Sequence, residues 1–321
     1  MIDLSYFNGK KIAIPGGNGF FGTHTINQLK KADCEIFVPK TSDGIDFRRR
    51  EDCIAYLGIV KPDIVINCAA NQGGIGYHSG KQADLFMDNI LMGTFLMQAS
   101  QKVGVKKFVN IIAGCSYPGY RELDELNEDE YWNGKVHDSI FSYGFSRKAT
   151  IVYGEALKRQ YNFNSIHLVM ANMFGPGEHF NPEQSKALAG LMKKIYEAKK
   201  FKKTSVEIWG TGSPVRDWLY VKDGAEGILL ATAKYNDIEP INIATGVGIS
   251  VKDLAEIIKD IVGYKGKFVF NTDKPDGALK KTFGIHQMKK KLKWLPGTSI
   301  EKGIKETLTW FDKNYEQAII H

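Results

Sequence analysis

The sequence has no long run of apolar residues and nothing that looks like an export signal. No segment approaches the roughly 18 consecutive apolar residues that a membrane-spanning helix requires. The first ten residues contain neither a basic stretch followed by an apolar core nor a cleavage site of small residues. We therefore expect a cytoplasmic protein with no membrane partner.

Cysteine is scarce, and its spacing is uninformative for metal binding. The four cysteines, Cys34, Cys53, Cys68 and Cys115, form no CxxC pair and no other spacing typical of metal ligands. Cys34 and Cys68 lie in apolar, strand-like runs, which is typical of buried thiols in a reducing compartment. The sequence therefore predicts no metal site.

A basic surface patch of the kind that binds nucleic acid is also missing. Lys and Arg total 43 against 36 Asp and Glu, which gives a formal net charge of +7. The excess is spread along the chain, and its two densest runs, 199–203 and 289–291, are typical of solvated helix ends and loops. We expect no nucleic-acid partner, because a doubly negative diphosphate substrate explains basic residues equally well.

The chain does have a regular alternation of short apolar strands with amphipathic helices. Such alternation predicts a parallel sheet with helices on both faces. We therefore predict an α/β fold: a Rossmann-type doubly wound parallel sheet in 1–170, and a smaller α/β substrate-binding lobe mainly in 171–321, part of which returns to the sheet. The expected strands cover 11–14, 35–38, 63–67, 107–112 and 165–170, and the expected helices cover 23–31, 50–57, 82–103, 143–160, 185–199, 251–262 and 299–314.

A glycine-rich loop follows the first expected strand. Its sequence, Pro-Gly-Gly-Asn-Gly-Phe-Phe-Gly, places glycines at 16, 19 and 22, directly before a helix. Gly16 permits a tight turn, Gly19 allows the backbone to approach a pyrophosphate, and Gly22 lets the helix lie close to the strand. The loop predicts a dinucleotide cofactor, held by the three glycines together with Phe20 and Phe21.

The end of the second strand bears on the choice between NAD and NADP. NAD enzymes usually place an acidic residue there to hold the ribose 2′-hydroxyl. This sequence has none, and it places Lys40 within reach of a 2′-phosphate. NADP(H) is therefore favoured, with NAD(H) as the alternative, and Asp46 is a candidate contact for the adenine edge.

Several motifs spread over the whole length resemble one family. Through these motifs and the glycine loop, the chain resembles the extended short-chain dehydrogenase/reductases, and among them the GDP-L-fucose synthases. That family converts GDP-4-keto-6-deoxymannose to GDP-fucose by a double epimerisation and an NADPH-dependent reduction. The motifs that carry the resemblance are Gly73-Gly74-Ile75, Asn89, Cys115-Ser116-Tyr117-Pro118, Tyr143, Asn172-Met173-Phe174-Gly175-Pro176, the segment from Trp209 to Leu219 and Lys274-Pro275-Asp276-Gly277.

The resemblance implies that Tyr143 is the catalytic acid or base. A tyrosine can serve when a nearby cation lowers its pKa from about 10. The family's lysine, four positions later, is Arg147 here, which can hold ribose hydroxyls and supply charge but cannot release a proton. Lys148 points about 100° away around the helix. The family's serine falls on Ala113, and whether Ser116 replaces its hydroxyl is left open.

The same resemblance implies a second pair of proton-transfer groups. The family's cysteine matches Cys115, and its histidine falls on Lys186. A lysine can donate a proton, or accept one if burial lowers its pKa. The alternatives are that Lys186 is a solvated residue on a basic helix and that His179 enters the site from the preceding loop.

The positions that would bind the substrate are better kept than the catalytic ones. Arg216 aligns with a diphosphate-binding arginine, and Lys194 replaces another. Trp209 and Asp276 are expected to contact the nucleotide or its ribose; otherwise they serve in core packing and loop capping. The resemblance also implies cofactor contacts from Ala69 and from Asn172, which is expected to touch the substrate as well.

Three interpretations follow from this mixture of kept and changed positions. The first is an NADP-dependent reductase or epimerase-reductase of a 4-keto-deoxy sugar linked to a nucleotide, with GDP implied by the family. The second is a nucleotide-sugar 4-dehydrogenase, epimerase or dehydratase with tightly held NAD(P). The third is a non-catalytic sugar-nucleotide-binding relative, which the presence of Tyr143 disfavours. The resemblance also implies a homodimer formed by the two long helices.

Overall fold

A six-stranded parallel sheet forms the larger part of the molecule. The computed structural model describes residues 2–120, 125–181, 185–274, 276 and 278–320. Three of its strands, at 64–67, 165–170 and 241–243, are buried at every position, which explains why most of their residues are apolar. In their spatial order, the strands are β2 (Glu35–Phe37), β1 (Lys11–Ala13), β3 (Ile64–Asn67), β4 (Lys107–Ala113), β5 (Ser165–Met170) and β9 (Ile241–Ile243).

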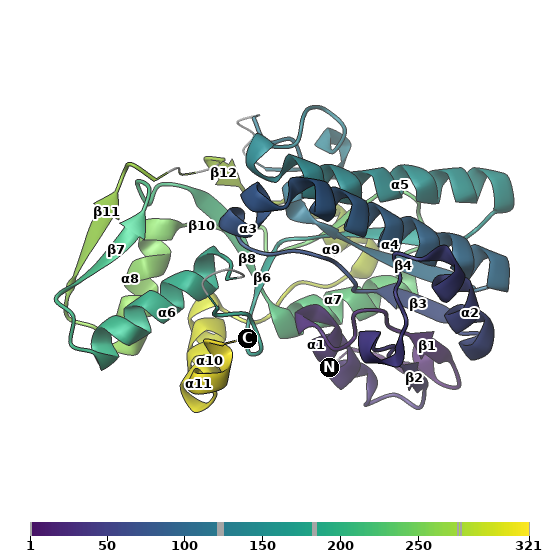
Figure 1. Ribbon diagram of the computed structural model, residues 1–321, viewed down its shortest axis with the longest axis horizontal. Coiled ribbons are helices and arrows are strands. Elements are labelled where there is room, and N and C mark those ends of the chain that lie inside the picture. Colours follow the sequence, from purple (N-terminus) through teal and green to yellow (C-terminus); the bar gives the residue numbers. More distant parts are fainter. Residues whose placement is uncertain (1, 121–124, 182–184, 275, 277, 321) are drawn as a thin grey trace.

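Helices cover both faces of this sheet (Figure 1). One layer contains α2 (Arg50–Val60), α4 (Gln82–Val103) and α5 (Phe141–Tyr161), and the other contains α1 (Phe20–Leu29), α7 (Val221–Lys234) and α9 (His286–Leu292). The strand order reverses between β1 and β3, and parallel α/β sheets bind ligands at the carboxyl edge of such a point. The predicted Rossmann-type doubly wound sheet is confirmed.

A second group of elements lies beside the sheet and builds its own apolar core. A four-stranded sheet is built around β8, which pairs with β6, β10 and β12, and a separate parallel pair joins β7 to β11. The helices α6, α8 and α10 contribute buried residues to this core. The strands are β6 (Asn172–Phe174), β7 (Ser205–Trp209), β8 (Val215–Tyr220), β10 (Gly248–Ser250), β11 (Lys267–Asn271) and β12 (Lys280–Lys281), and the helices are α6 (Ala187–Lys200), α8 (Val251–Val262), α10 (Ile300–Lys313) and α11 (Tyr315–Ala318).

Two differences from the expected elements matter for the site. Helix α1 begins at Phe20, three residues before the expected start, so it follows Gly19 directly. Helix α6 begins at Ala187, after the expected start at 185, because Lys186 is still in extended conformation at the N-cap. A short helix that the sequence pattern did not reveal, α3 (Ile75–Gly80), lies directly before α4.

Candidate active site

The glycine loop closes tightly between β1 and α1. Gly16 has a φ of +75°, and an added Cβ there would lie 2.5 Å from the backbone nitrogen of Ala69. An added Cβ at Gly22 would collide with the backbone of Gly16 and Gly17. Gly19 caps α1 without any side-chain hydrogen bond, which leaves the amides of the first turn available to an anion. This cradle fits a dinucleotide pyrophosphate.

Lys40 is available to a ligand, whereas the carboxylate of Asp46 is already in an ion pair. Lys40 is exposed just beyond β2. The carboxylate of Asp46 is bound by Arg48, whose Nη2 lies 2.8 Å from Oδ2, and these hydrogen bonds lower the pKa of Asp46. The cationic side chain of Lys40 is thus accessible beside the cofactor loop, whereas the acid is already paired.

Tyr143 lies in the first turn of α5, buried beneath the carboxyl edge of the sheet. Burial raises the pKa of its phenol to about 12, although the nearby Arg147 guanidinium acts in the opposite direction. Its ring meets the ring of His78 edge-on, with 5.1 Å between centroids. His78 comes from α3, is itself buried, and has its pKa lowered by that burial. Sequence reasoning missed His78, whose only signal was its position shortly after Gly73-Gly74.

Arg147 is turned inward, toward the sheet. Its Nη1 donates to the carbonyl of Ala69 at 3.4 Å, its Nη2 donates to the carbonyl of Ile111, and its Nε is buried without a hydrogen-bond partner among the described residues. The guanidinium therefore links the carboxyl ends of β3 and β4 and places a buried positive charge next to Tyr143.

Ser116 and Lys148 are both occupied elsewhere. The Ser116 hydroxyl donates to the carbonyl of Ala113 at 2.6 Å and pairs with the Tyr131 hydroxyl at 2.7 Å, fully buried. It therefore does not replace the hydroxyl missing at Ala113. The ammonium of Lys148 donates to the carbonyl of Tyr131 and lies 5.0 Å from the centroid of the Trp132 ring, so it points away from Tyr143.

Cys115 lies in a turn of 3-10 helix, η3 (Gly114–Ser116), close to several cations. Burial raises the pKa of its thiol, and the positive charges of Lys281, Arg147 and Lys186 act against that rise. Its charge also raises the pKa of Tyr143, so the thiol and the phenol share one electrostatic environment.

Lys281 is a site residue that sequence reasoning did not find. It lies on β12 with only 7% of its surface exposed, and its ammonium has no hydrogen-bond partner among the described residues. Its partner in the strand register is Arg216 of β8. Phe283, two residues later, lies against the position where Gly114 would carry a Cβ. Two neighbouring cations on adjacent strands are the arrangement that binds an anion such as a diphosphate.

Lys186 connects the second lobe to the glycine loop. Its ammonium lies 3.5 Å from Oε1 of the buried Glu178, and 5.4 and 5.3 Å from the ring centroids of Phe20 and Phe21. Lys186 is therefore a partly covered residue at the N-cap of α6 that is paired with a carboxylate. His179 is exposed, and its backbone amide donates to the Glu178 carboxylate.

Trp209 stands at the end of β7 with 59% of its surface exposed. Its Nε1 donates to Oε1 of Glu207 at 2.9 Å. The ammonium groups of Lys194 and Lys274 lie 4.8 and 5.5 Å from its ring centroid. An exposed indole with cations over its ring suits a nucleotide base joined to phosphates.

The other expected substrate contacts are partly engaged within the fold. Asp276 accepts hydrogen bonds from both the amide and the hydroxyl of Thr211, each at 2.8 Å, so it caps the loop after Trp209. The Arg216 guanidinium donates to the carbonyl of Val215. The side-chain amide of Asn172 donates to the carbonyl of Asp217 at 3.3 Å. Pro275 and Gly277 lie outside the described residues.

Among the described residues, no group of three or more His, Cys, Asp and Glu side chains is arranged to hold a metal ion. In the same part of the chain, every helix is too short or too polar to cross a membrane.

Known proteins match this chain over nearly its whole length. Residues 12–244 match the NAD dependent epimerase/dehydratase family. The chain is 32% identical to a GDP-L-fucose synthase of Sinorhizobium fredii, covering 96% of this chain and 97% of that protein. It is 30% identical to a probable GDP-L-fucose synthase 1 of Oryza sativa subsp. japonica, covering 97% and 94%. A crystal structure of a GDP-L-fucose synthetase from Naegleria fowleri bound to NADP superposes with a TM-score of 0.87 at 28% identity, covering 98% and 96%. The chain therefore belongs to the NAD dependent epimerase/dehydratase family, as an enzyme of the extended short-chain dehydrogenase/reductase type related to the GDP-L-fucose synthases.

Proposed function

We propose that this enzyme is an NADP-dependent reductase or epimerase-reductase of a GDP-linked 4-keto-deoxy sugar. The observation that carries the proposal is the meeting of Tyr143, Cys115 and the Arg147 charge at the carboxyl edge of the sheet, beside the glycine loop. The names of the related GDP-L-fucose synthases support the same substrate class. In this proposal residues 1–170, with the returning strand β9, bind the cofactor, and most of 171–321 binds the nucleotide sugar.

The cofactor is held by the glycine loop and the residues around it. Gly16, Gly19, Gly22 and the amides at the start of α1 receive the pyrophosphate, because the backbone there leaves room for it. When bound, the nicotinamide supplies the two electrons needed to reduce a carbonyl. Lys40 attracts the 2′-phosphate, and this is the reason to favour NADP over NAD.

Replacing Lys40 should weaken NADPH binding selectively. In Lys40→Ala, we expect the Kd for NADPH to rise about tenfold, equivalent to about 1.4 kcal/mol, while the Kd for NADH changes less than twofold. Lys30→Ala, which removes another exposed lysine at the C-cap of α1, serves as the control. Titration calorimetry with both cofactors measures the effect. An equal rise in the Kd values for NADPH and NADH would show that Lys40 does not select between the cofactors.

The nucleotide sugar lies in the second lobe in this account. Arg216 and Lys281, whose ammonium has no hydrogen-bond partner in the described part of the chain, bind the diphosphate, and Lys194 adds a third cation near Trp209. The base stacks on the exposed indole of Trp209, and Asp276 holds the loop that carries the stacking face. The sugar then extends toward Cys115. Burial lowers the pKa of Lys281, and the charge of the nearby Cys115 acts against that change.

The proton chemistry favours reduction over oxidation. A phenol whose pKa burial raises to about 12 is protonated at neutral pH, so Tyr143 is ready to donate its proton to the oxygen of a carbonyl that is being reduced. Arg147 stabilises the negative charge left on the phenolate oxygen. Oxidation of an alcohol requires the phenolate at the outset, and burial opposes that form. In the epimerisation step, Cys115 and Lys186 move protons next to the carbonyl.

Turnover with a panel of nucleotide sugars tests the proposal. GDP-linked and UDP-linked 4-keto sugars, together with their parent nucleotide sugars, are incubated with NADPH, and cofactor absorbance and product mass are followed. We expect NADPH consumption only with 4-keto substrates, and a product heavier by two hydrogens. Conversion of a parent sugar without net change in NADPH would instead establish an internal redox cycle.

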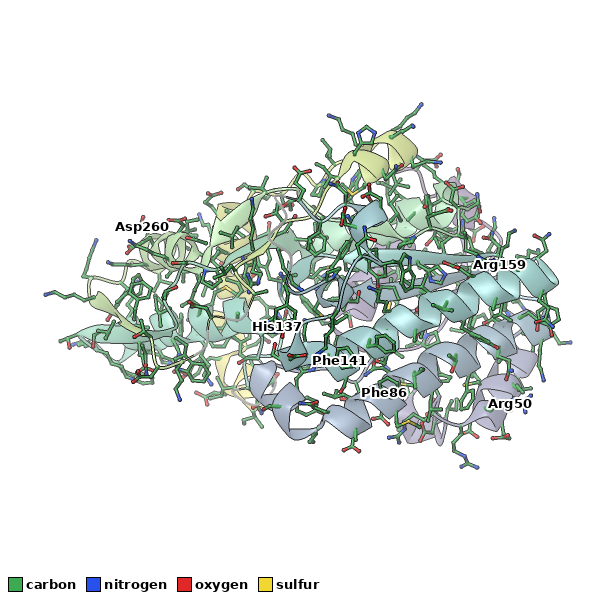
Figure 2. The ribbon with its side chains drawn as sticks, turned by 90° about the horizontal axis from the view of Figure 1, so that it is seen from above. Arg50, Phe86, His137, Phe141, Arg159 and Asp260 are labelled. Atoms are coloured by element: carbon green, nitrogen blue, oxygen red, sulfur yellow. The ribbon has the colours of Figure 1, made fainter. Side chains whose placement is uncertain are left out.

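We also expect a homodimer through the outer face of α4 and α5, which lie side by side in Figure 2. Three apolar side chains on these helices, Met87, Phe145 and Val152, are 50%, 43% and 52% exposed. Val152→Glu should convert a dimer into a monomer, because it places a charge within this apolar face. Val247→Glu, at an exposed apolar position in the second lobe, should leave the dimer intact. Sedimentation of both variants checks this, and a monomeric wild type would contradict it.

A further inference from the structure

The outward face of β7 carries a carboxylate next to the exposed indole. Val206 and Ile208 are buried in the core of the second lobe, and the alternate residues Glu207 and Trp209 are exposed. The strand lies with β11 at the end of the molecule, next to α6 and α8 (Figure 1). Glu207 and Trp209 therefore share one accessible surface.

Two hydrogen bonds hold this carboxylate at the edge of the ring. Oε1 of Glu207 accepts from Nε1 of Trp209 at 2.9 Å, and Oε2 accepts from Nδ2 of Asn271 at 3.2 Å. Asn271 is the register partner of Trp209 on β11. Each carboxylate oxygen can accept two hydrogen bonds, so both oxygens keep an unused acceptor position on the exposed side.

The other acid close to this loop, Asp276, is turned into the loop: it is less exposed than Glu207, and its Oδ1 lies against Gly210. Both carboxylate oxygens of Asp276 are used by Thr211, one by its amide and one by its hydroxyl. Cations surround the ring: Lys194 lies 4.8 Å and Lys274 lies 5.5 Å from its centroid. Glu207 is therefore the carboxylate best placed to accept from a base that stacks on Trp209, with phosphates directed toward the cations.

We propose that Glu207 selects guanine as the base of the substrate nucleotide. This inference rests on the proposed function, in which the base stacks on Trp209. Stacking tolerates every base, since each has a π-face, so discrimination needs a hydrogen-bonding group at the base edge. Guanine presents two adjacent donors, N1–H and the 2-amino group, which match the two oxygens of a carboxylate.

The other bases fit this acceptor pair less well. Uracil presents N3–H between two carbonyl oxygens, which a carboxylate repels. Hypoxanthine keeps N1–H but lacks the 2-amino group, so it loses one of the two hydrogen bonds. A site built to bond a particular N–H group rejects an analogue that lacks it. The expected order of affinity is GDP, then IDP, then UDP.

Titration calorimetry with GDP, IDP and UDP tests the inference on the full-length protein. We expect wild type to bind GDP about tenfold more tightly than IDP. In Glu207→Gln, which keeps an acceptor for Trp209, the affinity for GDP should fall about tenfold while that for IDP changes less than threefold. Glu301→Gln removes one charge from an exposed position on α10 and should behave as wild type. Thermal melting of each variant checks folding.

The outcomes separate this inference from the proposed function. If the wild type binds GDP and the Glu207→Gln variant still prefers GDP over IDP to the same extent, Glu207 does not select the base. The proposed nucleotide-sugar enzyme is then unaffected. A preference for UDP over GDP overturns the role of Glu207 and also the GDP part of the proposed function, while an enzyme acting on another nucleotide sugar remains. A wild type that binds none of the three nucleotides overturns both the inference and the proposed substrate class.

Discussion

Tyr143→Phe is expected to lower kcat about 1,000-fold while leaving the Kd for NADPH within twofold of wild type. The substitution removes the one proton that the account assigns to the substrate carbonyl, and general acid catalysis of this kind contributes about 100- to 10,000-fold. The ring itself is kept, so its contact with His78 and the packing at the start of α5 should survive. Stopped-flow reduction and cofactor calorimetry on the same sample measure the two quantities.

The pH dependence of the wild type gives an independent check on Tyr143. A phenol with its pKa raised to about 12 stays protonated as the pH rises, so kcat for reduction should show no alkaline decline caused by this group below pH about 10. Tyr161→Phe changes an exposed tyrosine at the far end of the same helix and should retain full activity. Full turnover in Tyr143→Phe would remove the phenol from the mechanism.

Arg147→Met is expected to cost about 3 kcal/mol of folding free energy and about 100-fold in kcat. The buried carbonyls of Ala69 and Ile111 would lose their donor, and an unsatisfied buried acceptor costs about 1–3 kcal/mol. The phenolate formed at Tyr143 would also lose the nearby charge that stabilises it. Urea unfolding and steady-state kinetics measure the two effects.

A conservative variant distinguishes charge from packing at this position. Arg147→Lys keeps a cation near Tyr143 and should retain kcat within about tenfold, even though a single ammonium cannot satisfy both carbonyls as a guanidinium does. Arg159→Met, at the exposed end of α5 labelled in Figure 2, should change neither stability nor kcat. If Arg147→Lys were as inactive as Arg147→Met, the charge would not be what matters.

Local sequence signals predicted the features that depend on neighbouring residues. The glycine loop was recognisable because a turn at Gly16 and the close approach at Gly22 are encoded within a few positions of each other. The bounds expected for α4 and α8 agree with the structure at both ends, and a glycine in left-handed conformation ends each helix. The buried strands were recognisable from their apolar composition.

Features created by distant segments were not predictable in the same way. Lys281 becomes a buried cation only because β12 pairs with β8 beside Arg216, and nothing in its local sequence distinguishes it from the neighbouring lysines. Lys186 gains its carboxylate partner from a loop eight residues earlier. Ser116 turned inward because Tyr131, from the following loop, offers it a buried partner. These outcomes depend on tertiary contacts that a single sequence does not display.

The most direct measurement is a crystal structure of the enzyme with NADP and the reduced nucleotide sugar bound together. The account predicts that the phenol oxygen of Tyr143 lies about 3 Å from the sugar hydroxyl formed by reduction, and that the carbon bearing this hydroxyl faces the nicotinamide. A complex in which the phenol is separated from both molecules, or in which another residue donates to that hydroxyl, would contradict it.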